Sequence, residues 1–397
     1  MSFRLMLKPS HPRIAAAVVL ALCFCCAPLF SQQTGVNESL VPSGDQPENP
    51  GPLASSISAE MRPEAIQAAM RRVADWELKQ VQSRPASRSW EFATLDQGFL
   101  AASNALHDPR YRQYVASIGA SHHWELLQGQ FPANDYTIAQ AYLSLYFDSH
   151  DENMIAPLRE RADAELPLAN NYERVVWDYC DALFVEPPAL ANLTRLSGDP
   201  KYLKYLDHEW LVTQTLLYDN NKHLFSRDIT YLDKYEKNGQ KIFWSRGNGW
   251  VIAGVAQVLE ALPVDSPSRP RYVQLLREMA GELASIQGKD GLWRPGLLDP
   301  ENYPYPEVSG SAFFTYAIAW GINHHLLSAK AYRPVVERAW RGMLSHIYED
   351  GRLGCIQPVG DSPAPYKEGS SYTFGVGLFL LAGSEVDILS RQMPKYR

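Results

Sequence analysis

Two kinds of connection alternate along the chain between segments of helical periodicity, and this alternation constrains the fold more than any other feature. One kind is short and polar, as in Ser149-His150-Asp151 and Gly198-Asp199-Pro200. The other kind is longer and aromatic, as in residues 219–225 and in the run KDGLW at 289–293. The alternation indicates a helical hairpin of about 60 residues that is repeated about six times, with every long connection at the same end.

Apolar residues recur at three- and four-residue spacing in twelve segments, which is typical of amphipathic helices. The segments are 62–82, 92–107, 110–126, 135–148, 152–166, 180–197, 199–217, 246–263, 268–287, 309–327, 331–347 and 371–390. We therefore predict an all-α protein, an (α/α)6 toroid whose inner helices are the even-numbered ones. An open stack of helix pairs is the alternative, although such stacks usually have shorter and more uniform repeats. A short hairpin is expected near 223–244.

The N-terminal part of the chain predicts export. Arg4, Lys8 and Arg13 precede an apolar run at 14–27, which is short for a membrane span of about 20 residues. We interpret residues 1–31 as a signal peptide, with a retained anchor as the alternative, and the polar residues 32–60 as a flexible leader. A catalytic domain over 61–397 would then be periplasmic or extracellular, with no stable membrane insertion.

Net charge disfavours nucleic acid as a partner. The chain has 37 Lys and Arg against 44 Asp and Glu, a formal charge of −7. Without the three basic residues of the signal the count is 34 against 44, or −10, whereas phosphate needs a basic surface. Outside the signal the cysteines are Cys180 and Cys355, which predicts either one disulfide or two buried thiols.

Unusual residues fall where the inner helices of such a toroid would begin. Trp90 precedes the second helix, Asp135 opens the fourth and Asp181 lies in the first turn of the sixth. The run WSRGNGW at 244–250 leads into the eighth helix, and the run EVSGS at 307–311 leads into the tenth. Because all these positions belong to one rim, we expect a single cleft there.

Each of these residues also has a purely structural interpretation. A lone Asp at a helix start usually acts as a cap, but two acids in one cavity, Asp135 and Asp181, suit acid–base chemistry on a sugar. Arg246 and Asn248 between Trp244 and Trp250 offer a guanidinium, an amide and two flat faces to a sugar carboxylate, or simply a packed turn. His223 and the pair Arg227-Asp228 follow the seventh helix at the same rim, where they contact either a ligand or loop backbone.

Several motifs together resemble those of unsaturated rhamnogalacturonyl hydrolases, glycoside hydrolase family 105. The run WDYCDALF at 177–184, followed by Pro187-Pro188, is similar to their catalytic segment, and NDYTIAQ at 134–140 to their second-aspartate segment. Residues 243–250, 307–311 and the run KEGS at 367–370 match in order and spacing, so the resemblance covers about 60–390. Asn134 stands where many relatives have Asp. The related unsaturated glucuronyl hydrolases of family 88 share the toroid and the chemistry.

The resemblance implies hydration of the C4=C5 enol ether that polysaccharide lyases leave on a terminal uronic acid. Asp181 would be the acid, with its pKa raised by burial and by Asp135, which would bind hydroxyls and stabilise the cationic transition state. Arg246 with His223 would pair with the carboxylate, Asn248 would bind the sugar, and Trp90, Trp244 and Trp250 would wall the subsite. The resemblance implies no metal and no other cofactor.

The expected partner is an oligosaccharide that ends in an unsaturated uronate, first of all galacturonyl-rhamnose from rhamnogalacturonan. One alternative is an unsaturated β-glucuronyl hydrolase for ulvan- or glycosaminoglycan-type products. Two others are a conventional inverting glycosidase and a glycan-binding protein without activity. The last would tolerate Asn in place of either Asp135 or Asp181.

Overall fold

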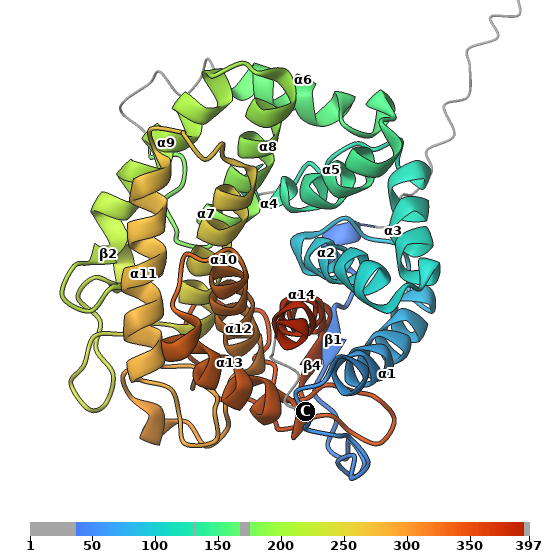
Figure 1. Cartoon of the computed structure of the whole chain (residues 1–397), viewed down its shortest axis with the longest axis vertical. Coiled ribbons are helices and arrows are strands. Elements are labelled where there is room, and N and C mark those ends of the chain that lie inside the picture. Colours follow the sequence, from blue (N-terminus) through green and yellow to red (C-terminus); the bar gives the residue numbers. More distant parts are fainter. Residues whose placement is uncertain (1–36, 130–131, 167–174, 393–397) are drawn as a thin grey trace, which may run out of the picture. The chain divides into compact units, whose positions relative to one another are not determined.

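The computed structural model describes residues 37–129, 132–166 and 175–392. The predicted signal peptide, residues 1–31, and the first residues of the predicted leader lie outside this part. Within the described part, six long helices form an inner ring (Figure 1). They are α2 (Trp90–Leu106), α5 (Thr137–Ser149), α8 (Pro187–Ser197), α10 (Ser245–Ala261), α12 (Val308–Asn323) and α14 (Thr373–Arg391). Each packs against the next, and α14 packs against α2. The ring is therefore closed, which confirms the toroid and excludes the open stack.

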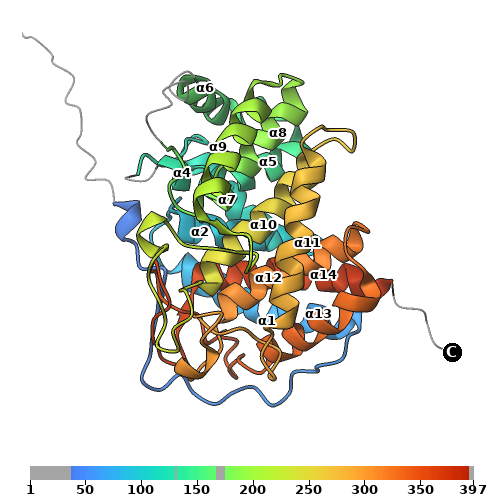
Figure 2. The same cartoon turned by 90° about the vertical axis from the view of Figure 1, so that its left-hand side faces the viewer.

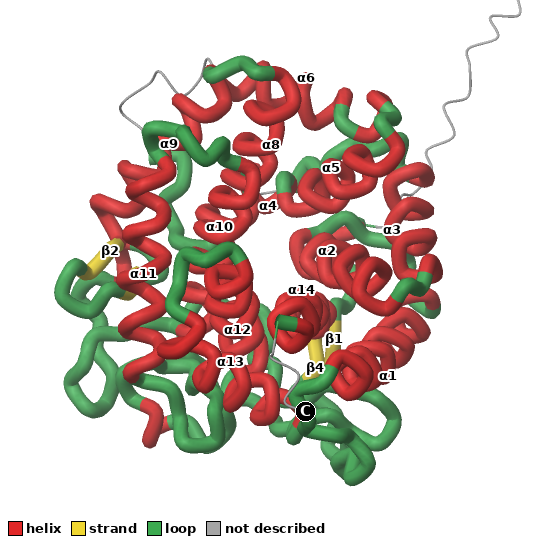
Figure 3. Tube along the Cα trace, viewed as in Figure 1, coloured by secondary structure: helices red, strands yellow, loops and turns green. Residues whose placement is uncertain are grey.

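Six further helices in the described residues lie outside the ring (Figures 1 and 3). They are α1 (Pro63–Gln82), α3 (Pro109–Ser121), α6 (Ala156–Glu165), α9 (Lys201–Leu217), α11 (Arg269–Ser285) and α13 (Ala329–Leu344). Each of the twelve segments of the sequence analysis thus corresponds to one of these twelve helices. Burial separates the two sets: α12 is buried on all sides over residues 308–322, whereas α13 buries one face. A helix that is surrounded by protein has no polar face to preserve.

Two glycines allow the ring to close tightly between α2 and α14. A Cβ at Gly98 would lie 2.3 Å from the carbonyl oxygen of Gly377, and a Cβ at Gly377 would lie 2.3 Å from the carbonyl oxygen of Thr94. No larger residue fits this approach of two backbones. Among the described residues α14 is the one helix long and apolar enough to cross a membrane, and 83% of its apolar window is buried within the protein.

One predicted helix is interrupted. The segment 180–197 divides into α7 (Ala182–Val185) and α8, with Glu186 between them. Pro187 and Pro188 have no N–H to continue the hydrogen-bond ladder of α7, but both suit the first turn of a new helix. Another short helix, α4 (Pro132–Asp135), precedes α5.

The strands of the described part are short (Figure 3). The expected hairpin is formed by β2 (Tyr218–Asp219) and β3 (Leu224–Phe225), which pair antiparallel, with a further bridge between Tyr235 and Lys241. The other pair is β1 (Gly44–Asp45) and β4 (Ser371–Tyr372).

Residues 37–60 depart from the expectation of a flexible leader. Strand β1 pairs with β4, Leu53 forms a bridge with Tyr348, and Glu38 pairs with Arg88 at 2.6 Å. Backbone pairing and a partly buried ion pair need no apolar side chains, so a polar composition did not reveal these contacts. This segment is part of the folded domain.

The long connections gather at one end of the ring, on the left in Figure 2. Cys180 lies in this region before α7, and Cys355 lies in the connection that follows α13; both are buried, free thiols. Of the two possibilities left by the sequence, the structure has the two thiols and no disulfide between them.

Candidate active site

A cavity of about 810 Å³ opens at the end of the ring where the inner helices begin. Its lining residues are Trp90, Asn134, Asp178, Tyr179, Asp181, Val185, Arg227, Asp228, Ile229, Thr230, Trp244, Arg246, Trp250, Val359, Gly360 and Asp361. Small-molecule sites commonly measure about 300–1,000 Å³, so the cavity can hold a small oligosaccharide. The predicted convergence on one rim is confirmed for Trp90, Asp181, Trp244, Arg246 and Trp250.

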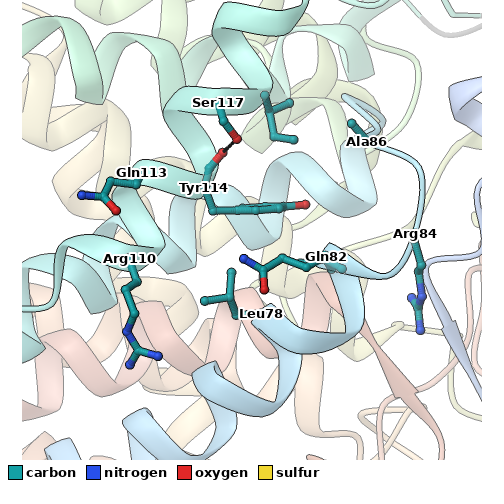
Figure 4. A pocket seen from close by; sticks show the side chains of 10 residues that line it. Leu78, Gln82, Arg84, Ala86, Arg110, Gln113, Tyr114 and Ser117 are labelled. Atoms are coloured by element: carbon teal, nitrogen blue, oxygen red, sulfur yellow. Dashed lines mark hydrogen bonds between the residues drawn. The ribbon is translucent and has the colours of Figure 1, made fainter.

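A second hollow of about 560 Å³ lies between α1 and α3 (Figure 4). Figure 4 shows the ring of Tyr114 beside Ser117 and Gln82 on its wall, with Arg84 and Arg110 also labelled. No Asp or Glu lines it, and Arg110 is paired with Asp75 and Asp108. Without a carboxyl group this hollow has no acid for glycoside chemistry, whereas the rim cavity has several.

Asp181 is a carboxyl group of the rim cavity whose pKa lies above its usual value. It precedes α7, but its side chain makes no capping hydrogen bond, so the capping interpretation fails. The side chain is 16% exposed, the Cys180 thiol donates to Oδ1 at 3.4 Å, and Nε of Arg227 lies 3.7 Å from Oδ2. Burial raises the pKa of Asp181 and the charge of Arg227 opposes that shift. A protonated carboxyl group facing a cavity can act as a general acid.

Two segments that are far apart in sequence bring Arg227 to Asp181. Tyr179 and Asp228 form an isolated antiparallel bridge, and the Cys180 N–H donates to the carbonyl oxygen of Arg227 at 2.8 Å. The Arg227 guanidinium lies over the Tyr179 ring, 5.0 Å from its centre, and Nη1 donates to Oδ2 of Asp228 at 2.9 Å. The position of Arg227 is therefore fixed from its backbone and from its side chain.

Asn134 and Asp135, adjacent in α4, take different directions. Asn134 lines the rim cavity, and its Oδ1 accepts a hydrogen bond from the Tyr179 hydroxyl at 2.7 Å. Asp135 is 4% exposed and lines another hollow, where Oδ2 accepts from the Gly129 N–H at 2.9 Å and from Arg161 at 3.3 Å. The prediction that Asp135 faces Asp181 across one cavity is wrong, because this ion pair holds it elsewhere.

Arg246 lies in the wall of the cavity but is fully buried, with 0% exposure. Nη1 donates to the carbonyl oxygen of Gln357 and Nη2 to that of Pro358, both at 2.7 Å. Its guanidinium carbon lies 4.5 Å from the ring centre of Trp244 and 4.9 Å from that of Phe374. These contacts support the packing interpretation of Arg246, since it braces the loop that carries residues 359–361.

Two further predicted ligand residues, His223 and Asn248, make contacts within the protein. Nδ1 of His223 lies 3.0 Å from the Tyr218 hydroxyl and 3.8 Å from Glu278 of α11, away from the cavity lining. Asn248 is fully buried; Oδ1 accepts from the Phe225 N–H, and Nδ2 donates to the carbonyl oxygens of Phe225 and Trp244. The packing interpretation therefore holds for Asn248, which is 0% exposed, whereas the sugar contact of His223 stays a prediction. Asn248 fixes the strand that ends two residues before Arg227.

Three tryptophans stand where the sequence analysis expects them. Trp90 and Trp250 meet edge to face with ring centres 5.7 Å apart, and Trp250 packs on Phe313 at 4.5 Å. Trp244 donates from Nε1 to Oε1 of Gln357 at 3.0 Å. All three line the cavity; their contact with a sugar stays a prediction.

Comparison with known proteins agrees with this architecture. The sequence model of glycosyl hydrolase family 88 matches residues 63–389. The chain belongs to this family. It is a glycoside hydrolase.

Relatives span nearly its whole length. An unsaturated 3S-rhamnoglycuronyl hydrolase of Formosa agariphila is 34% identical and covers 81% of this chain and 90% of that protein. One of the same name from Alteromonas sp. is 32% identical and covers 88% and 95%. A solved glycosyl hydrolase family 88 structure from Bacteroides vulgatus is 30% identical, with a TM-score of 0.75, and covers 82% of this chain and 99% of that one.

The family assignment refines the sequence analysis, which named family 105 first and family 88 as its relative. In this family 88 hydrolase, sequence reasoning missed the contribution of Asn134, Tyr179 and residues 359–361 to the cavity. The resemblance to family 105 did show that Asn134 stands where many relatives have Asp. This difference was the one sequence signal that pointed to Asn134 as a site residue. Nothing local marks residues 359–361, which reach the site through contacts with Trp244 and Arg246.

Proposed function

We propose that this family 88 hydrolase removes a 4,5-unsaturated uronic acid from the non-reducing end of lyase-generated oligosaccharides in which the next sugar is rhamnose. The observation that carries the proposal is Asp181, a mostly buried carboxyl group on a cavity with tryptophan walls, whose burial favours the protonated form. A protonated acid on a sugar-sized cavity suits proton transfer to an enol ether.

The reaction adds water across C4=C5. Asp181 gives its proton to C4, and positive charge develops at C5 and on the ring oxygen, next to the carboxylate that Asp181 has become. Water then bonds to C5 and returns a proton to Asp181. The resulting hemiketal opens, and the glycosidic oxygen leaves as the hydroxyl of the released sugar. The acid ends in its starting state.

Asn134 occupies the place in the cavity where the sequence analysis expected a second carboxylate. Its amide oxygen accepts from Tyr179, which leaves the amide nitrogen for a sugar hydroxyl. An amide cannot raise the proton affinity of Asp181 by charge, so burial supplies that effect here.

Two versions of the substrate remain to be separated. The resemblance to family 105 favours galacturonyl-rhamnose from rhamnogalacturonan. The names of the two relatives favour an unsaturated uronyl group on 3-sulfated rhamnose, as in ulvan-type products. The linkage to rhamnose is common to both versions.

The test is to incubate the protein separately with lyase-digested rhamnogalacturonan and lyase-digested ulvan, and to follow the absorbance of the unsaturated uronate. We expect the absorbance to decay with release of a rhamnose-ended product, and the faster decay identifies the natural aglycone. Asp181→Asn is the matched control and should preserve the chromophore. Cleavage that leaves the chromophore intact would indicate a conventional glycosidase, and binding without cleavage would indicate a glycan-binding protein.

Export also belongs to the proposal. The basic residues and the apolar run of residues 1–31 support removal of a signal peptide and a periplasmic or extracellular enzyme. The mass of the protein recovered from the periplasm and the medium tests this, since cleavage removes about three kilodaltons at roughly 0.11 kDa per residue. A full-length mass in the membrane fraction would instead support the retained anchor.

A further inference from the structure

Charge is distributed unevenly in the rim cavity. Its described lining has four carboxyl side chains, Asp178, Asp181, Asp228 and Asp361, but two cationic ones, Arg227 and Arg246. A uronate is an anion and needs a cation within reach. Arg246 is fully buried and donates to two loop carbonyls, whereas the Arg227 side chain is 25% exposed.

The Arg227 guanidinium also has bonding capacity left. Nη1 donates to Asp228, and Nε lies 3.7 Å from Oδ2 of Asp181, beyond hydrogen-bond range. Neither contact uses Nη2, and a guanidinium has five N–H donors, so the exposed part of this side chain can still donate to a ligand oxygen.

We propose that Arg227 pairs with the carboxylate of the unsaturated uronate, and that this pairing offsets the positive charge of Arg227 beside Asp181, so that substrate binding completes the protonation of Asp181. This inference rests on the proposed function. It differs from the sequence-based expectation, which gave the carboxylate to Arg246 and His223.

The charges around Asp181 support the coupling. The groups that face it are the cations Arg227 and Arg246, the anion of Asp228, and the Cys180 thiol, with the Tyr179 phenol beside Arg227. A bound uronate adds one negative charge to this group, and a negative charge beside a carboxyl group favours its protonated form. Binding therefore draws from solvent the fraction of a proton that Asp181 lacks in the free enzyme. This proton passes to C4 and is replaced by a proton of the attacking water.

The first test combines a change in the enzyme with a change in the substrate. The probes are the unsaturated uronyl-rhamnose disaccharide and its uronate methyl ester, which keeps the enol ether but not the charge. In the wild type, esterification should raise KM by about tenfold to a hundredfold. In Arg227→Gln the two probes should have similar KM values, because the group that distinguishes them is gone.

The second test is the pH profile, which a merely structural role of Arg227 would not move. In the wild type, the basic limb of kcat/KM, which reports the free enzyme, should lie at lower pH than that of kcat, which reports the complex. Removing a cation raises the pKa of a neighbouring carboxyl group. In Arg227→Gln the limb of kcat/KM should therefore move to higher pH, toward the position of the wild-type limb of kcat. Arg227→Lys keeps the charge and should leave the limb of kcat/KM near its wild-type position, with weaker binding because the planar fork is lost.

The outcomes distinguish this inference from the proposed function. If the wild type does not consume the chromophore, the proposed function fails. If the wild type is active but Arg227→Gln still prefers the acid over the ester by the wild-type factor, Arg227 does not bind the carboxylate. If Arg227→Gln does not fold, two measurements on the wild type and on Arg227→Lys test the inference instead. They are the rise in KM on esterification and the separation between the basic limbs of kcat/KM and kcat. Coincident limbs in the wild type would overturn the inference.

Discussion

Nη1 of Arg246 lies 2.7 Å from the carbonyl oxygen of Gln357, a residue 111 positions later in the chain. With the parallel bond from Nη2 to Pro358, it ties the start of α10 to the loop that follows α13. Glu307 holds the same loop from the start of α12, because its Oε1 accepts from the Gln357 N–H at 3.0 Å. Two inner-ring helices, α10 and α12, are thus joined to this loop by a buried polar network.

Arg246→Met should therefore act first on stability. The substitution keeps aliphatic packing but leaves the carbonyl groups of Gln357 and Pro358 without their donors, so we expect a loss of about 2–4 kcal/mol in the free energy of unfolding. Urea unfolding measures it. An unchanged unfolding midpoint together with a strongly raised KM would return Arg246 to the role of carboxylate partner.

Asp181→Asn should abolish proton donation while preserving the cavity. An amide has nearly the shape of a protonated carboxyl group but cannot give up a proton, so we expect kcat to fall by about 10²–10⁴ with little change in substrate affinity. Single-turnover kinetics on the unsaturated disaccharide, with binding followed separately, tests both halves. Turnover close to that of the wild type would place the acid elsewhere in the cavity.

Asp135→Asn and Asn134→Ala form an informative pair because the two residues are adjacent. Asp135→Asn weakens the pairing with Arg161 outside the rim cavity, so its kcat should fall by less than about tenfold. Asn134→Ala removes the acceptor of the Tyr179 hydroxyl and a polar group of the cavity, and should raise KM more than Asp135→Asn does. The reverse order in steady-state kinetics would restore Asp135 to the active site.

The sequence predicted what depends on spacing. Helix boundaries followed from apolar periodicity and from prolines, and the common rim of Trp90, Asp181 and Trp250 followed from the alternation of connections. Apolar periodicity and the alternation of connections can both be read from short stretches of sequence, and both recur along the chain.

The direction in which side chains point was harder to predict from the sequence. The helix that holds Asn134 and Asp135 is four residues long, barely one turn, so no periodicity distinguishes an inward from an outward position. The partner of Arg246 lies 111 residues away, and no local pattern announces it. His223 sits in a turn with φ +52°, and its contact with Glu278 depends on how α11 packs. These are tertiary relationships.

The last prediction concerns Glu186, the buried residue between α7 and α8. Burial raises the pKa of Glu186 from 4.5 to about 8, although the Trp177 N–H that donates to Oε2 at 2.8 Å favours the ionised form. Between about pH 4.5 and pH 8 the folded protein therefore keeps a proton that the unfolded chain has released. Stability should fall as pH rises through this window.

Glu186→Gln removes this titration but keeps an oxygen to accept from Trp177. The variant should match the wild type near pH 4.5 and exceed it at pH 8 by about 1–4 kcal/mol in the free energy of unfolding. Urea unfolding at pH 4.5, 6 and 8 measures the difference, with Glu64→Gln, at an exposed position of α1, as the matched control. The control should track the wild type at every pH. Parallel curves for wild type and Glu186→Gln would mean that Glu186 releases its proton in the folded protein as readily as in the unfolded chain, and that its burial is compensated by the groups around it.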